Sequence, residues 1–193
     1  GSYLGVAPAV DIIALKVFPD NEHSVPIGDM SRDLEEALSW VVDNHASYNI
    51  VAVNLSLGDG NYASPSSAQR IYSDELSSLI DSGVAVVAAA GNSFHSPYNS
   101  AEGLAAPAVF SNVISVGAVF DGDYGAESWL SGAVDHSSGA DRIVSFSQRH
   151  ETELDVLAPG AKITSANWNG STVTMSGTSQ AAPHVAGLVA LMQ

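Results

Sequence analysis

The chain has 193 residues, of which 46% are hydrophobic and 14% charged, so it can bury one sizeable core and is too apolar for a disordered segment. Its 21 acidic and 6 basic residues give a formal net charge of −15, which excludes nucleic acid and anionic membrane surfaces as partners because both require positive charge. The absence of cysteine excludes disulfides, metal thiolates and a catalytic thiol. We expect a single domain over residues 1–193, with no apolar run near the ~20 residues that span a bilayer.

The first half of the sequence alternates apolar runs with amphipathic segments. Residues 10–18 and 50–55 are nearly continuous apolar runs, which predict strands buried on both faces. Apolar residues recur at helical spacing over residues 31–47, and a second helix is expected from Pro65 to a stop at Gly83. Residues 84–90 predict a third strand.

This alternation predicts a three-layer α/β/α fold with a mostly parallel, doubly wound sheet. Ligands in such sheets bind beyond the carboxyl ends of the strands, which singles out the residues that follow Val17, Leu55 and Ala90. The second half is less regular. We expect a strand at 113–119, an acidic Gly/Ser-rich loop at 121–142, and short strands near 143–146, 154–157, 163–166 and 172–174.

The acidic loop raises the question of a metal site. Its oxygen side chains are of the kind that calcium prefers: Asp121, Asp123, Glu127, Asp135 and Asp141. The spacing does not fit an EF-hand, because Gly132 stands where that motif needs its twelfth-position Glu. A solvated acidic loop is the preferred interpretation, and a structural calcium ion remains open.

Residues 177–187 are the most informative stretch of the chain. Ser179 precedes a run from 181 to 192 in which every residue except His184 is apolar or Gly, so its hydroxyl is predicted at the N-terminus of a buried helix. Free N–H groups and the positive end of the helix dipole stabilise a developing oxyanion at such a place. An ordinary capped core helix would give the same local pattern.

The string Gly-Thr-Ser-Gln-Ala-Ala-Pro-His at residues 177–184 resembles the nucleophile motif of the subtilisin-like serine proteases, the subtilases. Asn92, at the end of the run 88–91, resembles the family's oxyanion donor. A neutral amide suits that role because it supplies an N–H donor without a full charge. The resemblance implies a secreted serine endopeptidase that acts on polypeptides through Ser179 and needs no cofactor for its chemistry.

Three more stretches follow the family's order, at residues 5–17, 54–58 and 154–160. The resemblance implies that Ser56, Leu57 and Gly58 bind an extended peptide by strand addition. It also implies a specificity pocket walled by Leu57, Ala89, Ala90, Gly91, Ala105, Ala106 and Pro107. Because these positions include no carboxylate, we expect cleavage after an apolar or aromatic residue.

A serine needs a base to take its proton, and the motifs found in this sequence do not include one. The family's His and Asp motifs belong upstream of the stretch at residues 5–8, and neither is present. His184 lies about 140° around the helix from Ser179 and is expected to point away from it. His95 is a weak substitute, and the remaining histidines have polar or acidic neighbours typical of a surface: His23, His45, His136 and His150.

We therefore expect the latter part of a subtilase catalytic domain, incomplete at both ends, inactive by itself and prone to self-association through an uncovered sheet edge. Two other functions stay open. One is a catalytically dead subtilase-like module kept for peptide binding, which the intact Ser179 and Asn92 disfavour because binding requires neither. The other is an unrelated parallel α/β binding domain, for which four motifs in order would be a coincidence. The sequence does not determine the oligomeric state.

Overall fold

The computed structural model describes residues 4–18 and 27–193, with only the backbone of 27–30. Its centre is a sheet of four parallel strands in the order β1–β3–β5–β8. These strands are β1 Ala52–Leu55, β3 Ala85–Ala89, β5 Ile114–Val119 and β8 Val156–Pro159. The helices are α1 Ile27–Tyr48, α2 Ser73–Asp81 and α3 Thr178–Leu191.

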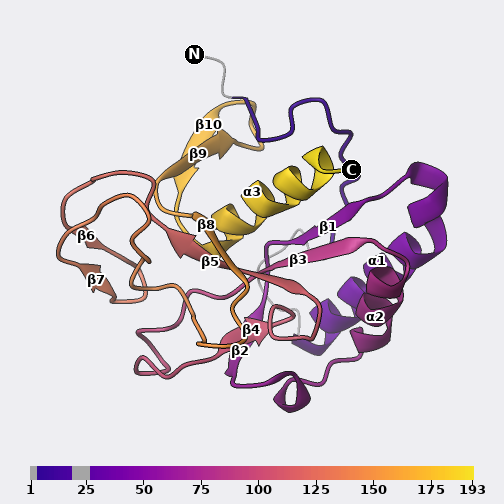
Figure 1. Cartoon of the computed structure of the whole chain (residues 1–193), viewed down its shortest axis with the longest axis horizontal. Coiled ribbons are helices and arrows are strands. Elements are labelled where there is room, and N and C mark those ends of the chain that lie inside the picture. Colours follow the sequence, from indigo (N-terminus) through magenta and orange to yellow (C-terminus); the bar gives the residue numbers. More distant parts are fainter. Residues whose placement is uncertain (1–3, 19–26) are drawn as a thin grey trace.

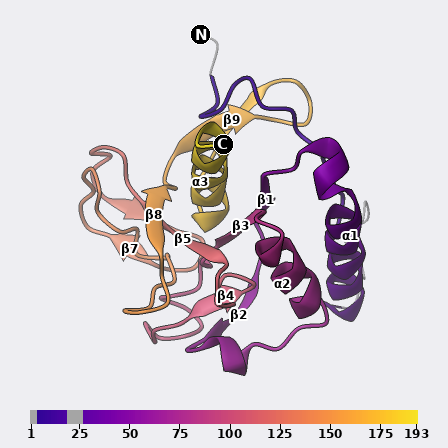
Figure 2. The same cartoon turned by 45° about the vertical axis from the view of Figure 1, so that its right-hand side comes forward.

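Different helices cover the two faces of the sheet. Figure 2 shows α3 on one side and α1 with α2 on the other. In β3, Val86 and Ala88 belong to the core beneath α1 and α2, whereas Val87 and Ala89 belong to the core beneath α3. Because successive side chains of a strand point to opposite faces of the sheet, both faces of β3 are buried. This explains the continuous apolar composition of the strand. The predicted three-layer fold with a mostly parallel sheet is confirmed.

Three antiparallel pairs of short strands extend this framework (Figure 1). They are β2 Asp59–Tyr62 with β4 Leu104–Ala106, β6 Glu127–Ser128 with β7 Val134–Asp135, and β9 Ile163–Ala166 with β10 Thr172–Met175. The strands β2 and β4 were not predicted, and β6 and β7 lie in the segment expected to be a loop. The β2–β4 pair matters for the site, because it joins the segment that follows β1 to the segment that follows β3.

Residues 10–18 do not form the strand that their composition predicts. The segment has no regular secondary structure and pairs with none of the described strands, and the side chain of Ile12 is 88% exposed. A strand needs a hydrogen-bonded neighbour, and an apolar sequence alone does not supply one. Both views show the segment passing beside α3 and the β9–β10 hairpin instead of entering the sheet.

The helix expected from Pro65 to Gly83 is interrupted. The structure has a single 3₁₀ turn, η1 Pro65–Ser67, and the α-helix begins only at α2. Ile71, predicted on the apolar stripe, is 54% exposed. The predicted stop is correct, since Gly83 has a φ of 81°, which favours glycine.

Most of the other predicted elements agree with the structure. Residues 143–146 contribute an isolated bridge between Ile143 and Val119 and no strand. The helix expected at 31–47 begins earlier, at Ile27. Among the described residues, no helix combines the length and the apolar character that crossing a membrane requires.

Gly160 fixes the position of α3 against the sheet. Its carbonyl accepts a hydrogen bond from the Gly177 N–H at 2.8 Å, and a Cβ at Gly160 would lie 2.6 Å from Ala118 Cβ and 2.8 Å from the Gly177 carbonyl oxygen. We expect Gly160→Ala to push α3 off the sheet and to lower the free energy of unfolding by about 1–3 kcal/mol. Urea unfolding measures this loss. Gly122→Ala, whose Cβ would have no neighbour closer than 3.8 Å, is the control, and equal stability of the two variants would contradict the prediction.

Candidate active site

A pocket of about 350 Å³ lies at the carboxyl edge of β1 and β3. The structure brings nine of the predicted site residues to its wall: Ser179, Asn92, Ser56, Leu57, Gly58, Ala89, Gly91, Ala105 and Ala106. The other two, Ala90 and Pro107, are buried and do not line it. The pocket therefore lies where ligands bind in parallel sheets.

Thr178 holds the side chain of Asn92 in one orientation. Asn92 Oδ1 accepts hydrogen bonds from the Thr178 N–H at 2.8 Å and from Thr178 Oγ1 at 3.0 Å. Thr178 Oγ1 in turn accepts a hydrogen bond from the Gly91 N–H at 3.0 Å. Because a backbone N–H only donates, the atom that faces Thr178 is the amide oxygen, and Nδ2 is left without an acceptor among the described residues. The amide N–H₂ of Asn92 is available to a ligand in the pocket.

Ser179 lies in the first turn of α3, where backbone N–H groups have no partner within the helix. Its side chain is half-buried, and its hydroxyl makes no hydrogen bond with a described residue. Its carbonyl accepts a hydrogen bond from Ser56 Oγ at 2.7 Å. Gly177, the N-cap of α3 two residues before Ser179, leaves room for Asn92, since a Cβ there would lie 3.2 Å from Nδ2. A free hydroxyl, a free amide donor and a helix N-terminus thus meet at one pocket.

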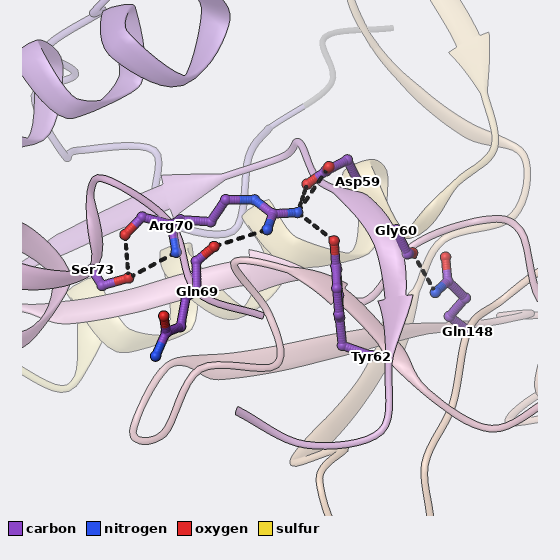
Figure 3. A network of polar contacts seen from close by, with 7 residues as sticks. All are labelled: Asp59, Gly60, Tyr62, Gln69, Arg70, Ser73 and Gln148. Atoms are coloured by element: carbon purple, nitrogen blue, oxygen red, sulfur yellow. Dashed lines mark hydrogen bonds and ion pairs between the residues drawn. The ribbon is translucent and has the colours of Figure 1, made fainter. Parts of the chain in front are cut away.

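Gln148 was not identified from the sequence, yet it connects the walls of the pocket. It is 1% exposed, and its Nε2 donates to the Gly60 carbonyl at 3.1 Å (Figure 3) and to Asn61 Oδ1 at 2.8 Å. Its Oε1 accepts from the Ser93 N–H at 3.4 Å, and its own backbone N–H donates to the Gly91 carbonyl at 2.8 Å. A buried amide with satisfied donors and acceptor keeps these loops together. A lone polar residue in a loop gives no pattern from which this role could be read.

None of the described histidines lines the pocket. His184 is half-buried, and its Nδ1–H donates to the Gln180 carbonyl of the same helix at 2.8 Å. His95 and His136 are exposed, and His23 lies outside the described residues. The described residues therefore place no imidazole beside Ser179.

One carboxylate does line the pocket. Asp59 follows Gly58 directly, and its side chain is 53% exposed and paired with Arg70. The positions selected from the sequence contained no carboxylate, but the pocket extends one residue beyond them. The unpredicted strand β2 accounts for the difference, because it carries Asp59 along the pocket rim opposite Ala106.

Tyr72 adds a buried phenol to the pocket wall. It is 3% exposed, and burial raises its pKa from 10.0 to about 12, with Arg70 acting in the opposite direction. Between these two pH values the folded protein keeps a proton that the unfolded chain has lost. The contribution of Tyr72 is therefore neutral below pH 10 and lowers the stability as the pH rises from about 10 to about 12, by up to roughly 3 kcal/mol.

We expect Tyr72→Phe to remove this part of the pH dependence. Urea unfolding of both proteins at a pH near 9 and a pH above 11 measures the difference. Equal losses of stability in the two proteins would show that the phenol does not cause the change.

Several carboxylates of the acidic loop at 121–142 accept hydrogen bonds or ion pairs from protein donors. Asp135 Oδ2 accepts from Trp129 Nε1 at 2.7 Å, and Glu127 pairs with Lys162 at 2.9 Å. Asp123 accepts hydrogen bonds within the loop. Over residues 4–18 and 27–193 no group of three or more histidine or carboxylate side chains could hold a metal ion.

The chain is similar to known proteins over its whole length. Residues 1–193 match the family model described as the Subtilase family. An alkaline proteinase of Hapsidospora chrysogena is 32% identical over 199 residues, which cover 100% of this chain and 40% of the proteinase. Subtilisin amylosacchariticus of Bacillus subtilis subsp. amylosacchariticus is 33% identical, over 98% of this chain and 40% of its own sequence. The chain thus spans about two fifths of the length of these two relatives.

Solved structures of proteases also resemble the chain. The self-cleaved protease domain of PatA has a TM-score of 0.67 and 26% identity, over 97% of this chain and 59% of that domain. A cold-adapted subtilisin-like serine proteinase has a TM-score of 0.60 and 30% identity, over 84% of this chain and 47% of that protein.

Proposed function

The chain belongs to the subtilase family of serine proteases, and we propose that it is the part of a serine endopeptidase that carries the nucleophile and an oxyanion donor. Ser179 Oγ attacks the carbonyl carbon of a peptide bond and gives its proton to a base from outside residues 1–193. The carbonyl oxygen takes up the electron pair of the broken π bond and is stabilised by Asn92 Nδ2–H. Collapse of the resulting tetrahedral intermediate expels the amine, which takes up the proton from the base. Water then hydrolyses the acyl-enzyme.

The hydrogen bonds between Thr178 and Asn92 are the observation that most supports this proposal. They join the residue before the nucleophile to the proposed oxyanion donor, at 2.8 and 3.0 Å. A donor held by fixed partners stabilises a transition state without reorganisation during the reaction. A module that only binds peptides does not require an amide oriented in this way.

The peptide is proposed to lie along Ser56, Leu57 and Gly58 by strand addition. Gly58 permits a narrow groove there, because a Cβ would lie 2.9 Å from the Ala106 carbonyl oxygen and 3.0 Å from Ala105 Cβ. The proposed chemistry uses protein side chains and water, without a cofactor. The similarity to subtilisins is the basis for a proposed extracellular location.

Fluorophosphonate labelling tests the proposal. We expect a form of the protein extended to include the missing His and Asp motifs to hydrolyse peptides and to be labelled at Ser179. We expect residues 1–193 alone to react far more slowly, because no base lies beside the hydroxyl. Peptide binding by the extended form without labelling would favour the dead module instead. Labelling of the isolated chain at a rate typical of intact serine proteases would contradict the need for an outside base.

A further inference from the structure

Arg70 and Asp59 form an ion pair at the rim of the pocket (Figure 3). Arg70 Nη2 lies 2.9 Å from both carboxylate oxygens of Asp59. Asp59 lines the pocket, whereas Arg70 does not, and their side chains are 53% and 19% exposed. The pocket therefore presents a carboxylate whose charge is balanced by a cation set back from the wall.

The guanidinium of Arg70 has several further partners that hold it in place. Its Nη2 also donates to the hydroxyl of Tyr62, and its Nη1 donates to the Gln69 carbonyl at 3.0 Å. The ring of Tyr62 lies beside it, with the guanidinium carbon 5.1 Å from the ring centre. Burial lowers the pKa of Arg70, but the hydrogen bonds to Tyr62 and Asp59 outweigh it, so the pKa is raised and the group stays charged.

The backbone on both sides is shaped to bring these groups together. Gly60 has a φ of 76°, and a Cβ there would lie 2.4 Å from the ring of Tyr62, so glycine allows the ring to fold back towards Arg70. Ser73 Oγ accepts from the Arg70 N–H at 3.3 Å and donates to the Arg70 carbonyl at 2.7 Å. These bonds hold Arg70 outside the helix that the sequence predicts there.

We propose that Arg70 sets the charge specificity of the pocket by neutralising Asp59, an inference that rests on the proposed peptidase function. An unpaired carboxylate on this wall, in a chain of net charge −15, would attract a lysine or arginine side chain of the substrate. With Arg70 in place the rim is neutral, and the small side chains of Ala89, Ala105 and Ala106 favour an apolar residue before the cleaved bond. Arg70 acts through Asp59 and is therefore a positioning residue.

Substrate preference tests this role in the active extended protein. The quantity is the ratio of kcat/KM for a peptide with lysine before the cleaved bond to that for the same peptide with leucine. We expect Arg70→Met to raise this ratio by about tenfold or more, and the double variant Arg70→Met with Asp59→Asn to return it to the starting value. A general loss of structure would lower both rates and leave the ratio unchanged. An unchanged ratio in soluble, folded Arg70→Met protein would overturn the inference.

The reciprocal variant covers the case in which Arg70→Met does not fold. Asp59→Asn keeps the shape of the side chain and leaves Arg70 without its countercharge. We expect it to raise kcat/KM for a substrate with glutamate before the cleaved bond, relative to leucine, by about tenfold. No gain for glutamate would also count against the proposal.

A binding measurement separates this inference from the peptidase proposal. The probe is p-aminobenzamidine, a fluorescent aromatic cation, titrated into the Ser179→Ala protein with and without Arg70→Met. We expect Arg70→Met to tighten binding about tenfold and the added Asp59→Asn to reverse the gain. Charge-dependent binding without hydrolysis by the protein with Ser179 intact would overturn the peptidase proposal alone. Hydrolysis that depends on Ser179, with probe binding and substrate preference both indifferent to Arg70, would overturn this inference alone.

Discussion

Replacing Ser179 by Ala is expected to abolish peptide hydrolysis by the active extended protein, with kcat lowered by at least about 10⁴-fold. The nearest hydroxyls cannot replace it. Thr178 Oγ1 is fully buried and bonded to Asn92 and to the Gly91 N–H, and Ser56 Oγ donates to the Ser179 carbonyl. Because the Ser179 hydroxyl has no hydrogen-bond partner among the described residues, the folded state should be as stable in the variant.

Steady-state kinetics and thermal unfolding of the same preparation check this prediction. Ser77→Ala, an exposed serine of α2 whose hydroxyl bonds to the Ser73 carbonyl of its own helix, makes the same chemical change away from the pocket. We expect it to keep full activity. Retention of more than about a hundredth of the activity by Ser179→Ala would mean that the hydroxyl at 179 is not the nucleophile.

Asn92→Asp is expected to lower kcat by about 10²–10³ with little change in KM, a magnitude taken from loss of an oxyanion-hole asparagine in subtilisin. The substitution is close to isosteric. The oxygen that accepts from Thr178 is retained, and the N–H₂ group is replaced by a second oxygen that repels a developing oxyanion. The loss should therefore appear in kcat, because the interaction forms in the transition state.

The control adds the same negative charge elsewhere. Asn167 in the β9–β10 hairpin also accepts a backbone N–H through its Oδ1, from Trp168 at 2.9 Å. We expect Asn167→Asp to leave kcat unchanged. If Asn92→Asp raised KM and left kcat intact, Asn92 would be a binding residue and not an oxyanion donor.

Local patterns predicted the parts of the site that each element carries by itself. The run 84–92 buries alternate side chains on two faces and ends at Asn92, and the sequence contains all of that information. The same holds for Ser179, whose place at a helix N-terminus follows from the apolar run behind it. Parallel topology accounts for the place of Asn92 at the carboxyl edge of the sheet. The helix α3 follows the β9–β10 hairpin instead, and its first turn is held at that edge by the hydrogen bonds of Gly177 with Gly160 and of Thr178 with Asn92.

The features that were not predicted depend on contacts between residues that are distant in sequence. Residues 10–18 have the composition of a strand, but strand formation depends on a neighbour that composition does not reveal. Arg70 lies in a helical pattern, and its bonds to Asp59 and Tyr62, 11 and 8 residues away, belong to a chain path outside any helix. Gln148 acts on Gly60 from 88 residues away, so its role requires the folded structure.

A crystal structure of the extended protein with a peptidyl boronic acid tests most directly whether Ser179 and Asn92 act at the same atom. The expected complex has boron bonded to Ser179 Oγ, with one boronate oxygen about 2.7–3.1 Å from Asn92 Nδ2 and the Asn92 Oδ1 still bonded to Thr178. A boronate attached to another residue, or bound at Ser179 with Asn92 turned away from every boronate oxygen, would contradict the proposed mechanism.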